Sequence, residues 1–180
     1  MYFETAGQVN TQETIALALQ AAEDNEIRHI VIASKGGDSA RLLIGTDCNV
    51  VCVTHVEGFE ENGKNFMDPE VRRELEAAGI QMLTTTHVLS GVERGISTKF
   101  GGIYPAEVMS HTLRMFGQGT KVCVEAAIMA LDAGLVPYGE RIIAIAGTGR
   151  GVDTALILTP AHAQRVFETR VHEVICKPGL

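Results

Sequence analysis

HIVIASKGGDS, residues 29–39, is the stretch that decides the fold of this chain. Its first five residues are mostly apolar and rich in β-branched side chains, which is typical of a parallel strand covered on both faces. The next six are small or polar and include two glycines, and residues 40–44 continue as a short predicted helix. A buried strand that passes through a tight loop into a helix is the repeating unit of α/β sheets.

The same pattern recurs along the chain. Apolar runs predict strands at 50–53, 80–83, 142–146, 155–158 and 171–176, and helical spacing predicts helices at 11–23, 69–78, 105–116 and 122–131. Asn10 and Glu13 have the spacing of a capping box, and Asp68 is a predicted helix cap. We therefore predict one domain over residues 1–180. Its predicted fold is a three-layer α/β/α structure with a mostly parallel sheet of about five strands, the last of them antiparallel.

Composition narrows the class of function. The 180 residues suit one domain, and a formal net charge of −7 without a basic stripe argues against nucleic acid as a partner. The first residues, MYFETAGQVN, lack the features of a signal peptide, and no apolar stretch reaches membrane-spanning length, so we expect a cytoplasmic protein without a membrane partner. Homo-oligomerisation is left open. The four cysteines lack metal-ligand spacing and are expected to be reduced and metal-free: Cys48, Cys52, Cys123 and Cys176.

Polar loops follow the predicted strands at the carboxyl edge of the sheet, where ligands bind in open α/β folds. The loop Ser34–Ser39 leads from a strand into a helix and offers hydroxyls, Lys35 and glycines. Backbone N–H groups in such a turn can face an anion, so this loop is a predicted phosphate site. The alternative is a capped turn that binds no ligand. It is not a P-loop, because the GxxxxGK[ST] pattern is absent.

The loop Gly147–Gly151 is the second glycine-rich segment. Its GxGxG spacing and the strand after it argue against a dinucleotide fingerprint. Arg150 could bind a phosphate or stack on a flat ring, and the glycines could leave a slot for such a ring. The alternative is an exposed hairpin tip.

Two histidines, His55 and His87, follow predicted strands and are expected either to contact a ligand or to be structural. They do not make a metal site without a third ligand. The segment 89–102 is predicted to be a loop over a bound ring, with an ordinary connection that contains an exposed charged helix turn as the alternative. The acidic loop 57–64 is predicted to be a solvated surface loop, with a lid as the alternative.

The order of these features resembles the C-terminal domain of pyruvate kinase. The parallels are Glu13–Ile15, Ser34–Ala40, Val50–Thr54 and Gly147–Ala155. In that family the two loops grip the phosphates of an allosteric sugar bisphosphate, whereas Asp38 in this chain disfavours a second phosphate. The kinase active site lies in a separate barrel of about 250 residues. We therefore expect no pyruvate kinase activity.

A closer resemblance is to a family of small stand-alone archaeal and bacterial proteins with this domain. The shared motifs are THxLSGxER at 86–94, KFGG at 99–102, FGQGxKVCVE at 116–125 and GTGRGxDTA at 147–155. That family resembles binders of flavin mononucleotide (FMN), so the resemblance implies FMN as the phosphorylated ligand. Together with the loops above, it gives these candidate FMN-binding residues: Ser34, Lys35, Gly36, Gly37, Asp38, Ser39, Thr54, His55, Thr86, His87, Ser90, Gly91, Arg94, Gly147, Thr148, Gly149, Arg150, Gly151, Asp153 and Thr154.

Three functions are compatible with these observations. The first is an FMN-binding protein, with oxidoreductase activity left open. The second is a regulatory sensor that binds a phosphorylated metabolite. The third is a hydrolase or lyase that uses His87 and Asp153 as an acid–base pair.

Overall fold

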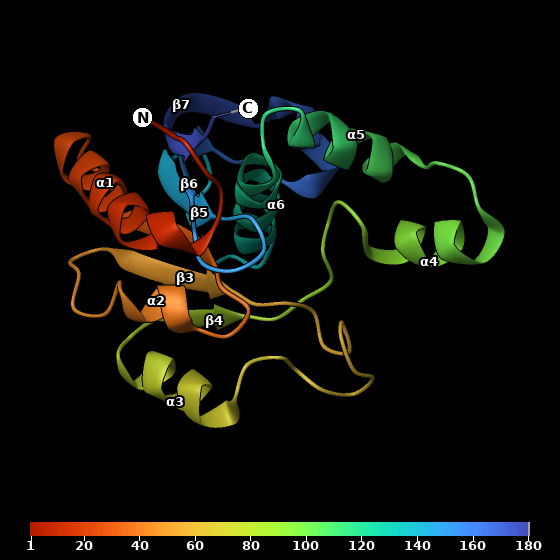
Figure 1. Cartoon of the computed structure of the whole chain (residues 1–180), viewed down its shortest axis with the longest axis horizontal. Coiled ribbons are helices and arrows are strands. Elements are labelled where there is room, and N and C mark those ends of the chain that lie inside the picture. Colours follow the sequence, from red (N-terminus) through yellow and green to blue (C-terminus); the bar gives the residue numbers. More distant parts are fainter. Residues whose placement is uncertain (180) are drawn as a thin grey trace.

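The computed structural model describes residues 1–179, which form a seven-stranded sheet in the order β1-β7-β6-β5-β2-β3-β4 (Figure 1). The strands are β1 (Tyr2–Phe3), β2 (His29–Ala33), β3 (Asn49–Val53), β4 (Gln81–Leu83), β5 (Ile142–Ala146), β6 (Thr154–Thr159) and β7 (Arg170–Pro178). The helices are η1 (Gln8–Asn10), α1 (Thr11–Asp24), α2 (Asp38–Arg41), α3 (Pro69–Ala77), α4 (Gly91–Phe100), α5 (Pro105–Arg114), α6 (Gln118–Asp132) and η2 (Ala163–Glu168).

Pairing in the sheet is mostly parallel, as predicted. β2 pairs in parallel with both β3 and β5, and β3 pairs in parallel with β4. β6 is the antiparallel strand and pairs with β5 and β7. The sheet has seven strands where about five were expected. The short strand predicted at 171–176 is the nine-residue β7, and β1, with only two residues, is too short to show a periodic pattern.

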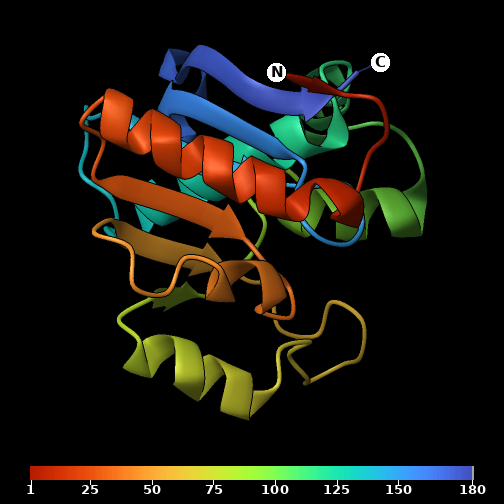
Figure 2. The ribbon, with the colours of Figure 1, turned by 60° about the vertical axis from the view of Figure 1, so that its left-hand side comes forward.

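Helices cover both faces of the sheet, which gives the predicted three layers (Figures 1 and 2). Alternate residues of each strand point to opposite faces. Ile30 and Ile32 pack in one core with residues of α1, α2 and α3, whereas Val31 packs in the other core against α6. Twelve of the fifteen residues of α6 are buried, so this helix is the main cover of its face.

Several local predictions were wrong. The capping box at α1 does not form, because the Asn10 side chain donates to the Thr5 carbonyl at 2.7 Å instead of capping the helix. Residues 91–100 form the helix α4, none of whose residues is buried. This rules out the loop over a ring and extends the exposed helix turn of the alternative to ten residues. At α3 the predicted cap is confirmed, since Asp68 accepts from the Glu70 backbone N–H at 2.7 Å.

All four cysteines are free thiols: Cys48, Cys52, Cys123 and Cys176. Burial raises the pKa of Cys52 to about 12 and that of Cys123 well above its usual value, so both stay protonated at neutral pH. Within the described residues, no helix is long and apolar enough to cross a bilayer.

The approach of α6 to β6 requires a residue without a side chain at position 119. A Cβ built there would lie 2.1 Å from Thr154 Oγ1 and 2.5 Å from Thr154 Cβ. We predict that Gly119→Ala lowers the free energy of unfolding by about 1–3 kcal/mol, the usual cost of overpacking, although Ala favours helix formation.

Gly95→Ala in α4 is the matched control, because nothing lies within 4 Å of the position that its new Cβ would take. It should be neutral or stabilising by up to about 1 kcal/mol. Urea unfolding of both variants measures the difference. Equal stability of the two would contradict the close approach of α6 to β6.

Candidate functional site

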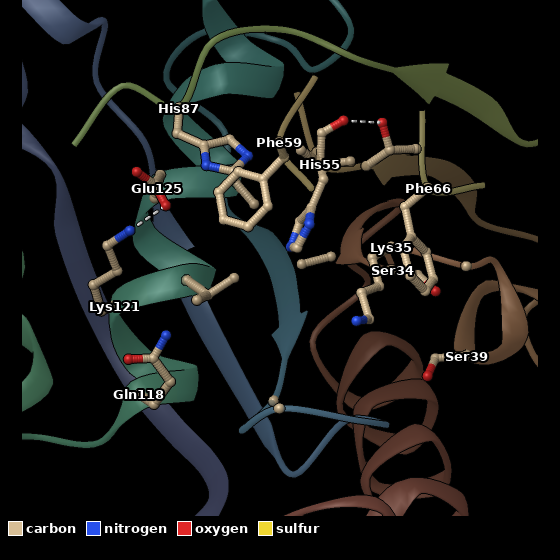
Figure 3. A pocket seen from close by; sticks show the side chains of 18 of the residues that line it. Ser34, Lys35, Ser39, His55, Phe59, Phe66, His87, Gln118, Lys121 and Glu125 are labelled. Carbon is tan, nitrogen blue, oxygen red and sulfur yellow. Dashed lines mark hydrogen bonds and ion pairs between the residues drawn. The ribbon is translucent and has the colours of Figure 1, made fainter. Parts of the chain in front are cut away.

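A cavity of about 740 Å³ opens at the carboxyl edge of the parallel strands, where the loops after β2, β3, β4 and β5 meet α6. Figure 3 shows its two sides, with Ser34, Lys35, Ser39 and Phe66 on one and α6 on the other. The predicted binding residues that line it are Ser34, Lys35, Gly36, Asp38, Ser39, Thr54, His55, His87, Ser90, Arg94, Gly147, Gly149, Arg150 and Gly151.

The β2–α2 loop places two hydroxyls at the cavity wall. Ser34 and Ser39 are both buried within the fold, and neither hydroxyl has a hydrogen-bond partner in residues 1–179. Gly37 closes the turn with φ +89°, and a Cβ there would lie 2.6 Å from Val71. Gly37 is therefore a structural glycine behind the loop, while Ser34 and Ser39 remain free to bind a ligand.

The β5–β6 loop lies against this first loop. Arg150 Nη2 is 3.9 Å from Asp38 Oδ2, so the two glycine-rich loops meet across the cavity mouth. A Cβ at Gly147 would lie 2.4 Å from the Gly151 carbonyl, and one at Gly151 would lie 2.4 Å from Thr11 Oγ1. A side chain at position 147 or 151 would clash with the protein itself, so both positions require glycine for packing. Gly149 differs, because it lies at the open tip of the loop with φ +78°.

Asp153 holds the base of the second loop. It is fully buried, and its carboxylate accepts from the backbone N–H groups of Gly7 at 2.8 Å and Thr148 at 3.2 Å and from the Thr154 hydroxyl at 2.8 Å. It does not line the cavity that His87 faces. The acid–base pair of His87 and Asp153 suggested by the sequence is therefore not formed.

Six predicted binding residues lie outside the cavity lining. Three of them have contacts within the protein that account for the residue type at that position. They are Gly37, Asp153 and Thr154, and the Thr154 hydroxyl donates to the Asp153 carboxylate. The others are Thr86 and Gly91, which pack against each other, and Thr148, whose backbone N–H binds Asp153.

Two histidines and an aromatic ring form the middle of the cavity wall. The His55 ring lies 4.2 Å from the Phe59 ring and 5.7 Å from the His87 ring, measured between centroids. His87 Nε2 accepts from the Val56 backbone N–H at 3.4 Å, whereas His55 Nδ1 is buried without a partner. Burial lowers the pKa of both histidines, and in His55 the positive charges of His87 and Lys35 lower it further.

The 57–66 segment contributes to the site more than the sequence indicated. Its Phe59 and Phe66 line the cavity, and Glu60 forms an ion pair with Lys35 at 3.3 Å. The Lys35 ammonium also lies 4.1 Å from the centre of the Phe66 ring. Its acidic composition led to the prediction of a solvated loop at 57–64. Phe59 within that loop and Phe66 just after it were the sequence signal that one side of the segment faces the protein.

The α6 side of the site was missed by sequence reasoning. Lys121 and Glu125 line the cavity, are each only 5% exposed, and form an ion pair. Glu125 Oε1 also accepts from the Leu89 backbone N–H at 2.9 Å, which ties α6 to the segment before α4. Two opposite charges four residues apart in an otherwise apolar helix were the available signal.

Positive charge prevails in the cavity, although the chain carries a formal net charge of −7. Five cationic side chains line it against two lining carboxylates, those of Asp38 and Glu125, and a third carboxylate, Glu60, pairs with Lys35 from outside the lining. The cations are Lys35, Arg94, Arg114, Lys121 and Arg150. Such a concentration of positive charge in a concave site attracts anionic ligands.

Together, the fold and cavity define a three-layer α/β domain with an anion-attracting cavity at the carboxyl edge of its sheet. The family model "Pyruvate kinase, alpha/beta domain" matches residues 12–158, and the chain belongs to this family.

Solved structures of a pyruvate kinase from Cryptosporidium parvum are similar to this chain. One, in complex with ADP, is 19% identical over 82% of this chain, with a TM-score of 0.42. A second is 18% identical over 83% of this chain, with a TM-score of 0.43. The chain spans 22% of the length of each of these pyruvate kinases.

The lowered pKa values of His55 and His87 predict a loss of stability in acid. As pH falls, the unfolded chain takes up these protons first, so the stabilisation is complete above about pH 6.5 and is lost through the folded pKa values. NMR titration of the imidazole resonances, assigned with His55→Gln and His87→Gln, should give midpoints below about 6.5. Midpoints at or above that value would contradict the burial of the two rings.

The buried ion pair between Lys121 and Glu125 in α6 predicts how two variants change the free energy of unfolding. Lys121→Met leaves the Glu125 carboxylate buried without its cation and should cost about 3–5 kcal/mol in unfolding free energy. Combining it with Glu125→Gln removes the charge and keeps an acceptor for the Leu89 N–H. This double variant should recover most of the loss in urea unfolding. A double variant no more stable than Lys121→Met would show that the unpaired carboxylate is not the cause of the loss.

Proposed function

We propose that this chain binds a phosphorylated small molecule, and specifically FMN, in the cavity at the carboxyl edge of its sheet. The observation that carries the proposal is the excess of cationic side chains around that cavity in an acidic chain. Ser34 and Ser39 add two hydroxyls free of internal hydrogen bonds. A phosphate prefers such donors and cations.

The lining residues fit FMN in three respects. The β2–α2 loop, with Ser34, Lys35 and Ser39, would hold the phosphate. His55 offers a buried ring nitrogen without a partner, which the ribityl hydroxyls or the ring would satisfy. Phe59, which lies beside His55, and Phe66 offer flat apolar surfaces for the ring system.

A monophosphate suits the first loop better than a bisphosphate. The Asp38 carboxylate lies beside Arg150, and also within 3.5 Å of Arg41, so it offsets positive charge near the cavity mouth. His87, Ser90 and Arg94 would then surround the rest of the ligand. When bound, FMN would supply electron or hydride transfer.

Pyruvate kinase chemistry is not part of this proposal, because the described residues form one α/β/α domain and the kinase active site lies in a (β/α)₈ barrel. We also place the chain in the cytoplasm, which is supported by the four free thiols of a chain that has no disulfide among its described residues.

A regulatory sensor is the second candidate, and α4 favours it. Ser90 at its start and Arg94 within it line the cavity, while Val92, Phe100 and the following Ile103 are each more than 70% exposed. A ligand that contacts Arg94 could therefore alter a helix that offers apolar side chains to a partner. Reduction of bound flavin by NAD(P)H would favour the oxidoreductase, and its absence would favour the sensor.

Titration of flavin fluorescence tests the proposal. FMN should bind more tightly than riboflavin, which lacks the phosphate, and Ser39→Ala should weaken FMN by about 1–2 kcal/mol, the value of a hydrogen bond to a charged group. Ser97→Ala is the matched control, because that hydroxyl bonds Glu107 outside the cavity. Ser39→Ala should leave riboflavin affinity unchanged.

Two outcomes would contradict the proposal. Absence of saturable FMN binding at high micromolar concentration would exclude FMN and leave another phosphorylated metabolite. Equal affinity for FMN and riboflavin would remove the phosphate site from the β2–α2 loop.

A further inference from the structure

The α6 side of the cavity carries more positive charge than its own carboxylate balances. Lys121 lines this side together with Arg94 and Arg114. Lys121 pairs with Glu125, whereas neither guanidinium has a carboxylate partner within residues 1–179. Arg114 Nε and Nη1 donate to neutral groups, Gln118 Oε1 and Ser110 Oγ, each at 2.8 Å. Two uncompensated positive charges therefore remain.

The base of this side is rigid. The ion pair of Lys121 with Glu125 is buried, and Glu125 is further held by the Leu89 backbone N–H. The opposite charges of Lys121 and Glu125 balance each other. The Glu125 carboxylate therefore does not also neutralise the guanidinium charges of Arg94 and Arg114. Burial lowers the pKa of Lys121, Glu125 opposes that change, and the charges of Arg114 and Arg94 add to it. Each guanidinium is therefore near enough to Lys121 to disfavour its charged form.

This side is separate from the β2–α2 loop. Figure 3 shows Lys121 and Glu125 across the cavity from Ser34 and Ser39, with the Phe59 ring between them. The Arg94 guanidinium lies 5.8 Å from the centre of the Phe59 ring. Arg94 would thus stand between a ligand at the β2–α2 loop and one at α6.

We propose that the α6 side is a second anion site, which binds the oxyanion group of a small organic acid alongside the phosphorylated ligand. Guanidinium groups bind carboxylates and phosphates through paired hydrogen bonds, and such an anion would offset the two guanidinium charges that act on Lys121. Val122, Ala126 and Met129 line the wall beside them and offer no carboxylate that would compete with the acid.

The cavity is large for a pocket that holds one ligand. Its volume of about 740 Å³ is in the upper part of the roughly 300–1,000 Å³ range of pockets that hold one drug-sized ligand. The organic acid would share the cavity with the proposed FMN, but its binding does not depend on FMN being the other ligand.

Calorimetric titration with oxalate at constant ionic strength tests the second site, and inorganic phosphate in the Ser39→Ala variant tests the alternative source of the oxyanion. We expect saturable binding of one or both. Arg94→Gln and Arg114→Gln should each weaken it roughly tenfold or more, the loss expected for one charge-assisted hydrogen bond. Arg165→Gln is the matched control, since Arg165 is paired with Glu168 outside the cavity.

The same titration with saturating FMN separates the two proposals. Oxalate binding that persists with FMN bound supports two ligands in one cavity. Oxalate binding without any FMN binding would leave the second anion site standing and remove the proposed function. The second site is overturned if neither anion saturates, if the two arginine variants bind as the wild type does, or if FMN displaces the anion.

Discussion

Parallel pairing of β2 with β3 on one side and β5 on the other determines where the functional groups of this domain lie. Parallel neighbours end at the same edge of a sheet, so loops that are far apart in sequence become adjacent there. Asp38 follows β2 and Arg150 follows β5, yet their side chains approach to 3.9 Å. The cavity is a consequence of this arrangement, and the antiparallel β6 then returns the chain from the same edge.

Helix α6 closes the cavity and carries a chemical feature of its own. Most of the helix is apolar and buried, which anchors it to the sheet, and the exceptions Lys121 and Glu125 face the cavity. Burying two charges is costly unless they are paired and hydrogen-bonded. The Leu89 N–H meets part of that requirement and fixes the start of the segment that leads to α4. The cavity and the exposed helix α4 are thus linked through one carboxylate.

Much of this could be predicted from the sequence, because the signals were local. The apolar runs at β2, β3 and β5 and the polar loops after them identified the sheet and the edge at which the cavity opens. The ion pair on α6 was missed because it depends on which face of a buried helix meets the cavity, and this is set by tertiary packing. Gly37 and Asp153 looked like ligand residues, yet their contacts are with the chain itself, a distinction that no local pattern contains.

The central claim is that the cavity holds a phosphorylated flavin, and the most direct test is native mass spectrometry of the protein purified without added ligand. We predict a mass increment equal to one FMN per chain, released on denaturation and accompanied by flavin absorbance. If one different phosphorylated molecule is found per chain, the assignment of the phosphate site stands and FMN is replaced by that molecule as the ligand. A chain that carries no small molecule after purification and gains none after incubation with FMN would contradict the claim.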